Sequence, residues 1–105
     1  MGFRGGMSEL MRQASRLQRK VAKRKEELKE ETVEATAGND RVKVVVNGAQ
    51  ELVEVVIEPE LLENEELSMV QDLIVAAANA AITKSNELVE QEVEKVTGGI
   101  NIPGL

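Results

Sequence analysis

The sequence predicts an α+β protein of α-β-β-β-α order, in which a three-stranded antiparallel sheet lies between two long helices. Two observations predict this class. Apolar residues recur at helical spacing near both ends of the chain, and three short valine-rich runs separated by turn signals lie between those segments. The 105 residues suffice for one domain, which we expect to span residues 1–105.

The first helix is expected over residues 8–31. Ser8 is a suitable N-cap, and the apolar side chains that follow are spaced by three, four or seven residues. These side chains form a heptad seam: Leu10, Ala14, Leu17, Val21 and Leu28. Arg24 occupies one seam position, where it either pairs with a glutamate of a partner helix or extends its charge into solvent. A narrow apolar stripe of this kind is typical of helices that pair with another helix.

Three strands are expected, at residues 32–37, 41–46 and 52–57. A turn at residues 38–40 separates the first two, and Asn47-Gly48 predicts a type I′ turn in which both residues have positive φ. Alternation places one valine-rich set on a single face of the sheet: Val42, Val44, Val46, Val53, Val55 and Ile57. The opposite face is also partly apolar, which indicates a second covered surface. Its apolar residues are Val45, Leu52 and Val56.

The second helix is expected over residues 65–97, followed by a tail without regular structure at residues 98–105. Its alanine-rich segment, residues 76–81, allows close approach to the sheet or to a second copy of the chain. Helices of this length, about 36 and 50 Å, exceed the width of a compact domain, so they must project. On a projecting helix the apolar seam would be exposed to water unless another helix packed against it, which predicts a homodimer. Either helices of two chains or the first and last helix of one chain cover each other.

The composition removes most enzyme chemistry. The chain contains no His, Cys, Trp or Tyr, and Phe3 is its single aromatic residue. Ordinary zinc and haem sites, cysteine nucleophiles and His-based triads are therefore excluded, and we expect no catalysis, metal, cofactor or small-molecule substrate. The apolar stretch at residues 73–82 is too short to span a bilayer, and no signal peptide is evident, so a cytoplasmic location without a membrane partner is expected.

The net charge of −6 conceals a strong asymmetry between two segments. Residues 1–25 carry eight basic residues and one Glu, a net charge of +7, whereas residues 26–105 carry a net charge of −13. Opposite the seam, four cations recur one helical turn apart and form a basic stripe: Arg12, Arg16, Arg19 and Lys23. Lys20, Arg24 and Lys25 widen this stripe, and Arg4 lies in the same basic segment. Such a row can meet successive phosphates of a nucleic acid, although a solvated helix face or a membrane-surface helix shows similar patterns.

Six stretches, in order along almost the whole chain, resemble the YbaB/EbfC family of bacterial nucleoid-associated proteins. They are Gly5-Gly6-Met7, Leu10-Met11-Arg12-Gln13-Ala14, Val44-Val45-Val46-Asn47-Gly48, Val55 to Leu62, Asp72 to Ala77, and Gly98 to Gly104. The resemblance implies a tweezer-like homodimer with protruding helical arms that bind double-stranded DNA, organise the nucleoid and modulate gene expression. The basic positions that match the family's arm are Arg12, Arg16, Arg19, Lys20 and Lys23. The sequence departs from the family pattern in its heavily acidic second helix, whose negative charge opposes non-specific binding to DNA. The alternative is a protein-interaction module that holds another protein through its heptad seam and acidic surface, with the basic stripe matching an acidic partner.

Overall fold

The computed structural model describes residues 2–99 of the chain and, within this range, the side chains of residues 6–99. Six elements follow one another: α1 (Gly2–Leu28), β1 (Thr32–Ala37), β2 (Val42–Asn47), β3 (Leu52–Ile57), α2 (Pro59–Asn64) and α3 (Leu67–Thr97). The strands form one antiparallel sheet in the order β1-β2-β3. The predicted α+β class and the α-β-β-β-α order are confirmed.

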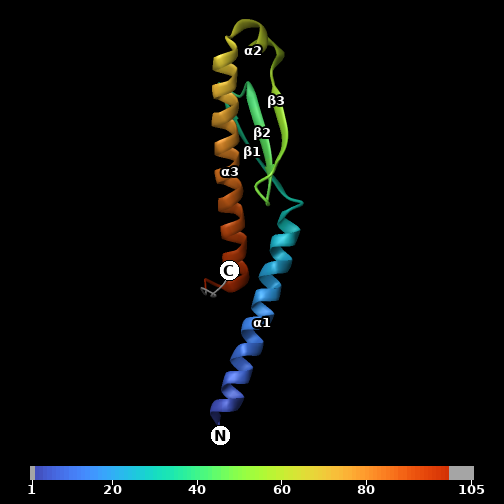
Figure 1. Cartoon of the computed structure of the whole chain (residues 1–105), viewed down its shortest axis with the longest axis vertical. Coiled ribbons are helices and arrows are strands. Elements are labelled where there is room, and N and C mark those ends of the chain that lie inside the picture. Colours follow the sequence, from blue (N-terminus) through green and yellow to red (C-terminus); the bar gives the residue numbers. More distant parts are fainter. Residues whose placement is uncertain (1, 100–105) are drawn as a thin grey trace.

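The molecule is a long rod (Figure 1). Its principal extents are 76 × 18 × 16 Å, and its radius of gyration is 20.3 Å, against about 13 Å for a compact domain of this length. Helix α3 lies along the sheet, whereas α1 runs away from the sheet and ends at the opposite pole of the rod. The expectation that long helices protrude is therefore confirmed, and α1 is the arm.

The limits of α1 differ from those expected. The helix begins at Gly2 instead of Ser8 and ends at Leu28 instead of Glu31. Ser8 is therefore an internal helical residue, and its expected role as N-cap is wrong. Glycine disfavours a helix by about 1 kcal/mol per residue without removing a backbone donor, so the glycine-rich start does not stop α1. After Leu28 the chain turns, and the Glu31 amide donates to the Leu28 carbonyl at 3.1 Å.

The second helical segment is divided. Pro59 occupies the first turn of the short helix α2, where its missing N–H costs nothing, and Glu65 has the extended backbone that separates α2 from α3. Helix α3 then begins at Leu67, two residues after the expected start, and Gly98 ends it in the left-handed conformation with φ 65°. The rest of the expected tail, residues 100–105, lies outside the described residues.

The core lies between the sheet and α3, which packs against β1 and β2. The inward-facing Val42, Val44 and Val46 of β2 are fully buried. Ala77 and Ala81 face them from α3 and are also fully buried, because alanine lets the helix backbone approach the sheet closely. The alanine-rich segment therefore packs against the sheet of its own chain.

Strand β3 lies beyond the reach of α3 and is exposed along almost its whole length. Val53 and Val55 keep 58% and 42% of their surface exposed. A β-bulge opposite Val45 and Val46 shifts the register, so that Leu52 pairs with Val46. Residues that pair directly share a face of the sheet, so the expectation that Leu52 lies on the opposite face is wrong.

The turn between β2 and β3 is not the expected type I′ turn. Positive φ occurs at Gln50, at 60°, and neither Asn47 nor Gly48 has it. The Asn47 side chain instead caps a wider loop, because its Oδ1 accepts hydrogen bonds from the amides of Ala49 and Glu51 at 2.9 and 3.1 Å. Such an Asx arrangement replaces the two-residue turn that Asn-Gly usually forms.

Candidate nucleic-acid interface

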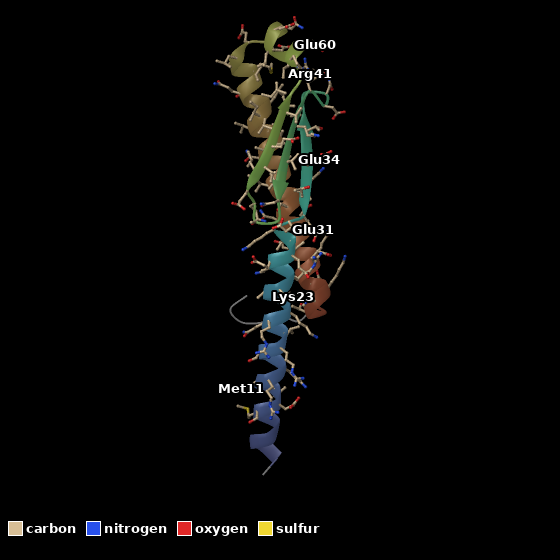
Figure 2. All side chains as sticks on the ribbon, turned by 90° about the vertical axis from the view of Figure 1, so that its right-hand side faces the viewer. Met11, Lys23, Glu31, Glu34, Arg41 and Glu60 are labelled. Atoms are coloured by element: carbon tan, nitrogen blue, oxygen red, sulfur yellow. The ribbon has the colours of Figure 1, made fainter. Side chains whose placement is uncertain are left out.

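The basic stripe runs along α1 from Arg12, on the outer part of the arm, to Lys23, which lies beside the end of α3. All four of its side chains are exposed to solvent, as are the flanking Lys20 and Lys25. Figure 2 places Lys23 on the arm, far along the rod from Glu34, Arg41 and Glu60. The positive charge predicted for the first helix is therefore separated in space from the acidic body.

Most of these cations have no carboxylate partner. Arg12 has one weak contact, with Glu9 at 4.0 Å in the same helix. Among the side chains of residues 6–99, no carboxylate oxygen lies within 4.0 Å of the following five cations: Arg16, Arg19, Lys20, Lys23 and Lys25. Uncompensated cations in a row produce a positive potential that attracts a polyanion.

The heptad seam is covered only toward its C-terminal end. Val21 and Leu28 are fully buried in the contact between α1 and α3, and Leu17 is half-buried. Leu10 keeps 63% of its surface exposed, and Ala14 is exposed as well. Within one chain, α3 therefore covers the base of the arm and leaves its outer half bare. The basic stripe lies opposite the seam, and Lys23, its member nearest the base of the arm, lines a hollow that also includes Val96 of α3.

Arg24 differs from the other predicted DNA-contacting residues. Its guanidinium donates to Glu31 at 2.9 Å, to Glu27 at 3.5 Å and to Glu92 of α3. Its side chain is 23% exposed, against 65% for Arg12. The partner glutamate considered for this seam position therefore belongs to α3 of the same chain. The side chain of Arg4 lies outside those described.

The acidic body occupies the other end of the rod. Helix α2 and the beginning of α3 carry most of its charge at this pole: Glu60, Glu63, Glu65, Glu66 and Asp72. Arg41 forms a salt bridge with Glu65 at 3.7 Å and neutralises part of the negative charge at this pole. No group of three or more residues in the described part of the chain is arranged to hold a metal ion.

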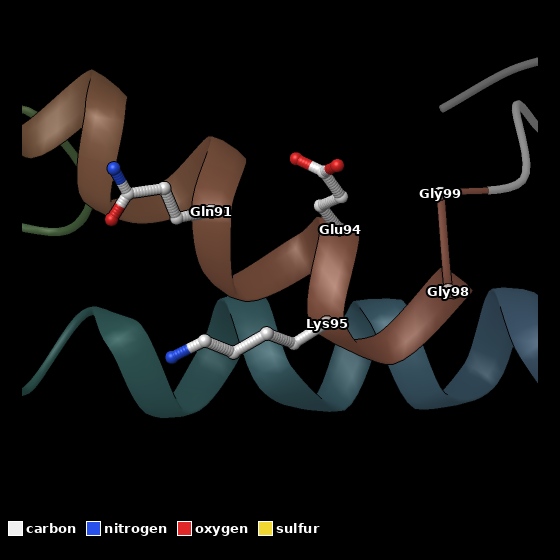
Figure 3. Close-up of a pocket in the computed structure, with 5 residues that line it drawn as sticks. All are labelled: Gln91, Glu94, Lys95, Gly98 and Gly99. Carbon is white, nitrogen blue, oxygen red and sulfur yellow. The ribbon is translucent and has the colours of Figure 1, made fainter.

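Two shallow hollows accompany the contact between α1 and α3. One, of about 390 Å³, is lined by Lys20, Lys23, Arg24, Glu27 and Val96. The other, of about 380 Å³, lies at the end of α3 beside α1 and is lined by Gln91, Glu94, Lys95, Gly98 and Gly99 (Figure 3). Lys20 and Lys23, both exposed, line the first hollow, so the basic surface extends to the groove between the two helices.

Two structural residues were not identified from the sequence. Ser85 of α3 is fully buried. Its hydroxyl donates to the Asn47 carbonyl at 2.7 Å and accepts from the side-chain amide, Nε2, of Gln50 at 3.1 Å. Glu92 was read as one of several acidic residues of the second helix, although it holds Arg24 and also Lys95 at 2.6 Å. A serine four residues after Ala81, on the buried face of α3, was the available signal for Ser85.

Comparisons with known proteins identify the family of this chain. The model of the YbaB/EbfC DNA-binding family matches residues 2–100. A protein of Acetivibrio thermocellus named a nucleoid-associated protein is 46% identical over 105 residues, covering 99% of this chain and 93% of its own. A protein of the same name from Syntrophobacter fumaroxidans is 50% identical over 95 residues, covering 90% of this chain and 86% of its own.

The fold also occurs in a solved structure. An uncharacterized protein of Helicobacter pylori superposes with a TM-score of 0.62 at 23% sequence identity, covering 73% of this chain and 89% of its own. In the described residues, we find no helix with the length and apolar character needed to cross a membrane. The family match extends over the arm, the sheet and the long third helix together. The chain belongs to the YbaB/EbfC DNA-binding family.

Proposed function

We propose that this protein binds double-stranded DNA as a homodimer, through the basic stripe of α1 and mainly by contacts with phosphates. The observation that carries the proposal is the row of exposed cations without carboxylate partners, on an arm that projects from an acidic body. Cations one helical turn apart, about 5 to 6 Å, can meet successive phosphates of a strand, whose spacing is about 3.4 Å along the axis and longer along the backbone path. The acidic body repels the duplex and so restricts it to the arms.

Double-stranded DNA is favoured over single strands for a chemical reason. Proteins that hold single strands stack the bases on aromatic side chains, and Phe3 is the single aromatic residue of this chain. Phosphate contacts by Arg and Lys carry little sequence information, so low to moderate sequence preference is expected. The relatives are named nucleoid-associated proteins, which supports a role in the nucleoid. We propose that this role is to organise DNA and to modulate gene expression.

The exposed apolar surface of β3 supports the homodimer. Leu52, Val53, Val55 and Val56 keep between 42% and 58% of their surface exposed in the single chain. An exposed edge strand with apolar side chains promotes unspecific association, and proteins usually bury it. We propose that a second copy of the chain buries β3. A two-fold axis along the rod would place both arms at the same end, as in tweezers.

The test is a fluorescence anisotropy titration of a labelled duplex with matched pairs of substitutions. Arg16→Gln/Lys23→Gln removes two charges from the arm, and Lys43→Gln/Lys84→Gln removes two charges from the body. The arm pair is expected to weaken binding at least about tenfold, and the body pair to leave binding within about twofold. Equal losses for the two pairs, or tighter binding to a single strand of the same length, would contradict the proposal.

A further inference from the structure

The contact between the arm and α3 contains one ion cluster that joins the two helices. Arg24 of α1 binds Glu92 of α3, a residue 68 positions away in the sequence, and also binds Glu27 and Glu31 on its own side of the contact. Lys95 binds the second oxygen of Glu92 at 2.6 Å. These partners hold the Arg24 guanidinium in one orientation between the two helices.

The cluster disfavours a phosphate at Arg24. Three carboxylates surround this one guanidinium, and Lys95 compensates only part of their charge. Glu92 is 16% exposed, so the pair is largely shielded from solvent and is screened less by salt than an open surface pair. The hydrogen bond that Arg24 donates to Glu92 raises the pKa of Arg24, while the hydrogen bonds that Glu92 accepts from Lys95 and Arg24 lower the pKa of Glu92.

The position of the cluster along α1 makes the direction of the arm depend on it. Arg24 lies between Val21 and Leu28, the two seam residues that α3 buries fully. Outward from Arg24, the arm continues for about 33 Å to its end. A swing of about 10° at this point displaces the end of the arm by about 6 Å, more than the 3.4 Å axial spacing of phosphates on one strand.

We propose that Arg24 is a positioning residue, whose pair with Glu92 sets the direction of the arm and so aligns the basic stripe with the phosphates of the duplex. This inference rests on the proposed function. It differs from a direct DNA contact in a way that can be measured. Replacing Glu92 removes a negative charge, which by simple electrostatics strengthens binding to DNA, whereas loss of positioning weakens it.

The variants are Arg24→Gln, Glu92→Gln and the exchange Arg24→Glu/Glu92→Arg, with Lys23→Gln as the matched control. Lys23 is the exposed neighbour of Arg24 and has no carboxylate partner among the described side chains. Far-ultraviolet circular dichroism establishes that each variant retains its helices. The exchange restores opposite charges across the two helices, but the new carboxylate faces Glu27 and Glu31 and the new guanidinium faces Lys95, so it is expected to restore the contact only in part.

The first measurement needs no DNA. The chain contains no cysteine, so Ser8→Cys and Thr83→Cys place two spin labels, one on the arm and one on α3, and dilution with unlabelled protein isolates distances within one chain. Both single Gln variants at the pair are expected to broaden the distance distribution, the exchange to narrow it in part relative to the single variants, and Lys23→Gln to leave it unchanged. A distribution that stays as narrow in Arg24→Gln and Glu92→Gln as in the parent would overturn the proposal.

The second measurement is duplex affinity as a function of salt. Glu92→Gln and Arg24→Gln are expected to weaken binding at least about threefold without changing the salt slope, whereas Lys23→Gln lowers the slope by about 1 for each arm bound. Tighter binding by Glu92→Gln, or a lowered slope for Arg24→Gln, would show that Arg24 acts as a plain charge. If the parent protein does not bind duplex DNA, the proposed function fails, and the spin-label distances still decide whether Arg24 and Glu92 set the arm.

Discussion

The amide of Gly48 donates to the carbonyl of Leu28 at 3.1 Å, and the two backbones are in direct contact at this point. A Cβ atom on residue 48 would lie 2.2 Å from the Leu28 carbonyl oxygen. Gly48 also donates to the Glu31 carbonyl at 3.1 Å. Hydrogen bonds therefore join the turn after α1 to the loop between β2 and β3. This contact is the place where the base of the arm meets the sheet.

Replacing Gly48 is therefore expected to destabilise the protein. In Gly48→Ala the new methyl group collides with backbone, which cannot move aside as a flexible side chain can, and the expected loss is about 2 to 4 kcal/mol in the free energy of unfolding. Gly6→Ala is the control, because nothing lies within 4 Å of a Cβ there and alanine favours the helix by about 1 kcal/mol. Urea denaturation of both variants measures the difference, and equal stability of the two would contradict the contact.

Ser85 offers a second test of the packing of α3 on the sheet. Ser85→Ala leaves the Asn47 carbonyl and the Gln50 amide without their buried hydroxyl partner. The Asn47 carbonyl still accepts from the Gln50 backbone amide, and the Gln50 side chain still donates to the Gly48 carbonyl. The expected cost is therefore that of a lost hydrogen bond, about 0.5 to 1.5 kcal/mol. Ser68→Ala, at an exposed position of α3, should change the unfolding free energy by less than about 0.5 kcal/mol. If Ser85→Ala lowers the unfolding free energy no more than Ser68→Ala does, the Ser85 hydroxyl does not contribute to stability.

The contribution of Glu92 to stability should depend on pH. The hydrogen bonds from Lys95 and Arg24 lower its pKa in the folded state below the usual 4.5. The unfolded state therefore binds the proton more readily, so the contribution is fully present above pH 4.5 and is lost as pH falls through the lowered value. The stability difference between the parent and Glu92→Gln is thus expected to be constant near neutral pH and to shrink in acid. A difference that grows as the pH falls would have the wrong sign.

The β3 surface gives a prediction about assembly. Val53→Lys/Val55→Lys places charges on exposed side chains, so the single chain should keep its fold while the dimer dissociates, as sedimentation velocity measures. Thr36→Lys, at an exposed position of β1 on the far edge of the sheet, should leave the dimer intact. A dimer that persists in the β3 variant would place the interface elsewhere, for example at the bare outer seam around Leu10.

The periodic features of the fold could be predicted from the sequence. The alternation of Val42, Val44 and Val46 identified the buried face of β2, because period two and burial on one face go together. Helix lengths longer than a compact domain predicted the protruding arm. The basic stripe was evident from its spacing, and its exposure follows from its position opposite a seam whose base α3 covers.

The features that pattern reasoning missed depend on contacts between distant segments. Asn47-Gly48 reads as a tight turn, but Gly48 is needed because the Leu28 carbonyl occupies the space of a side chain. The bulge that moves Leu52 to the face of Val46 has no local sign in a run of valines. The seam position of Arg24 predicted a glutamate partner as one of two alternatives, and the partner, Glu92, is identified only when α3 brings it to α1.

The most direct test of phosphate binding by the arm is the salt dependence of duplex affinity, measured from 50 to 200 mM salt for the parent and for Arg16→Gln/Lys23→Gln. A dimer making about 6 to 10 phosphate contacts should lose roughly 10³ to 10⁵-fold in affinity over this range. Neutralising two cations on each of two arms should lower the slope of log affinity against log salt by about 3 to 4. A parent affinity that hardly changes with salt, or an unchanged slope in the variant, would contradict the account.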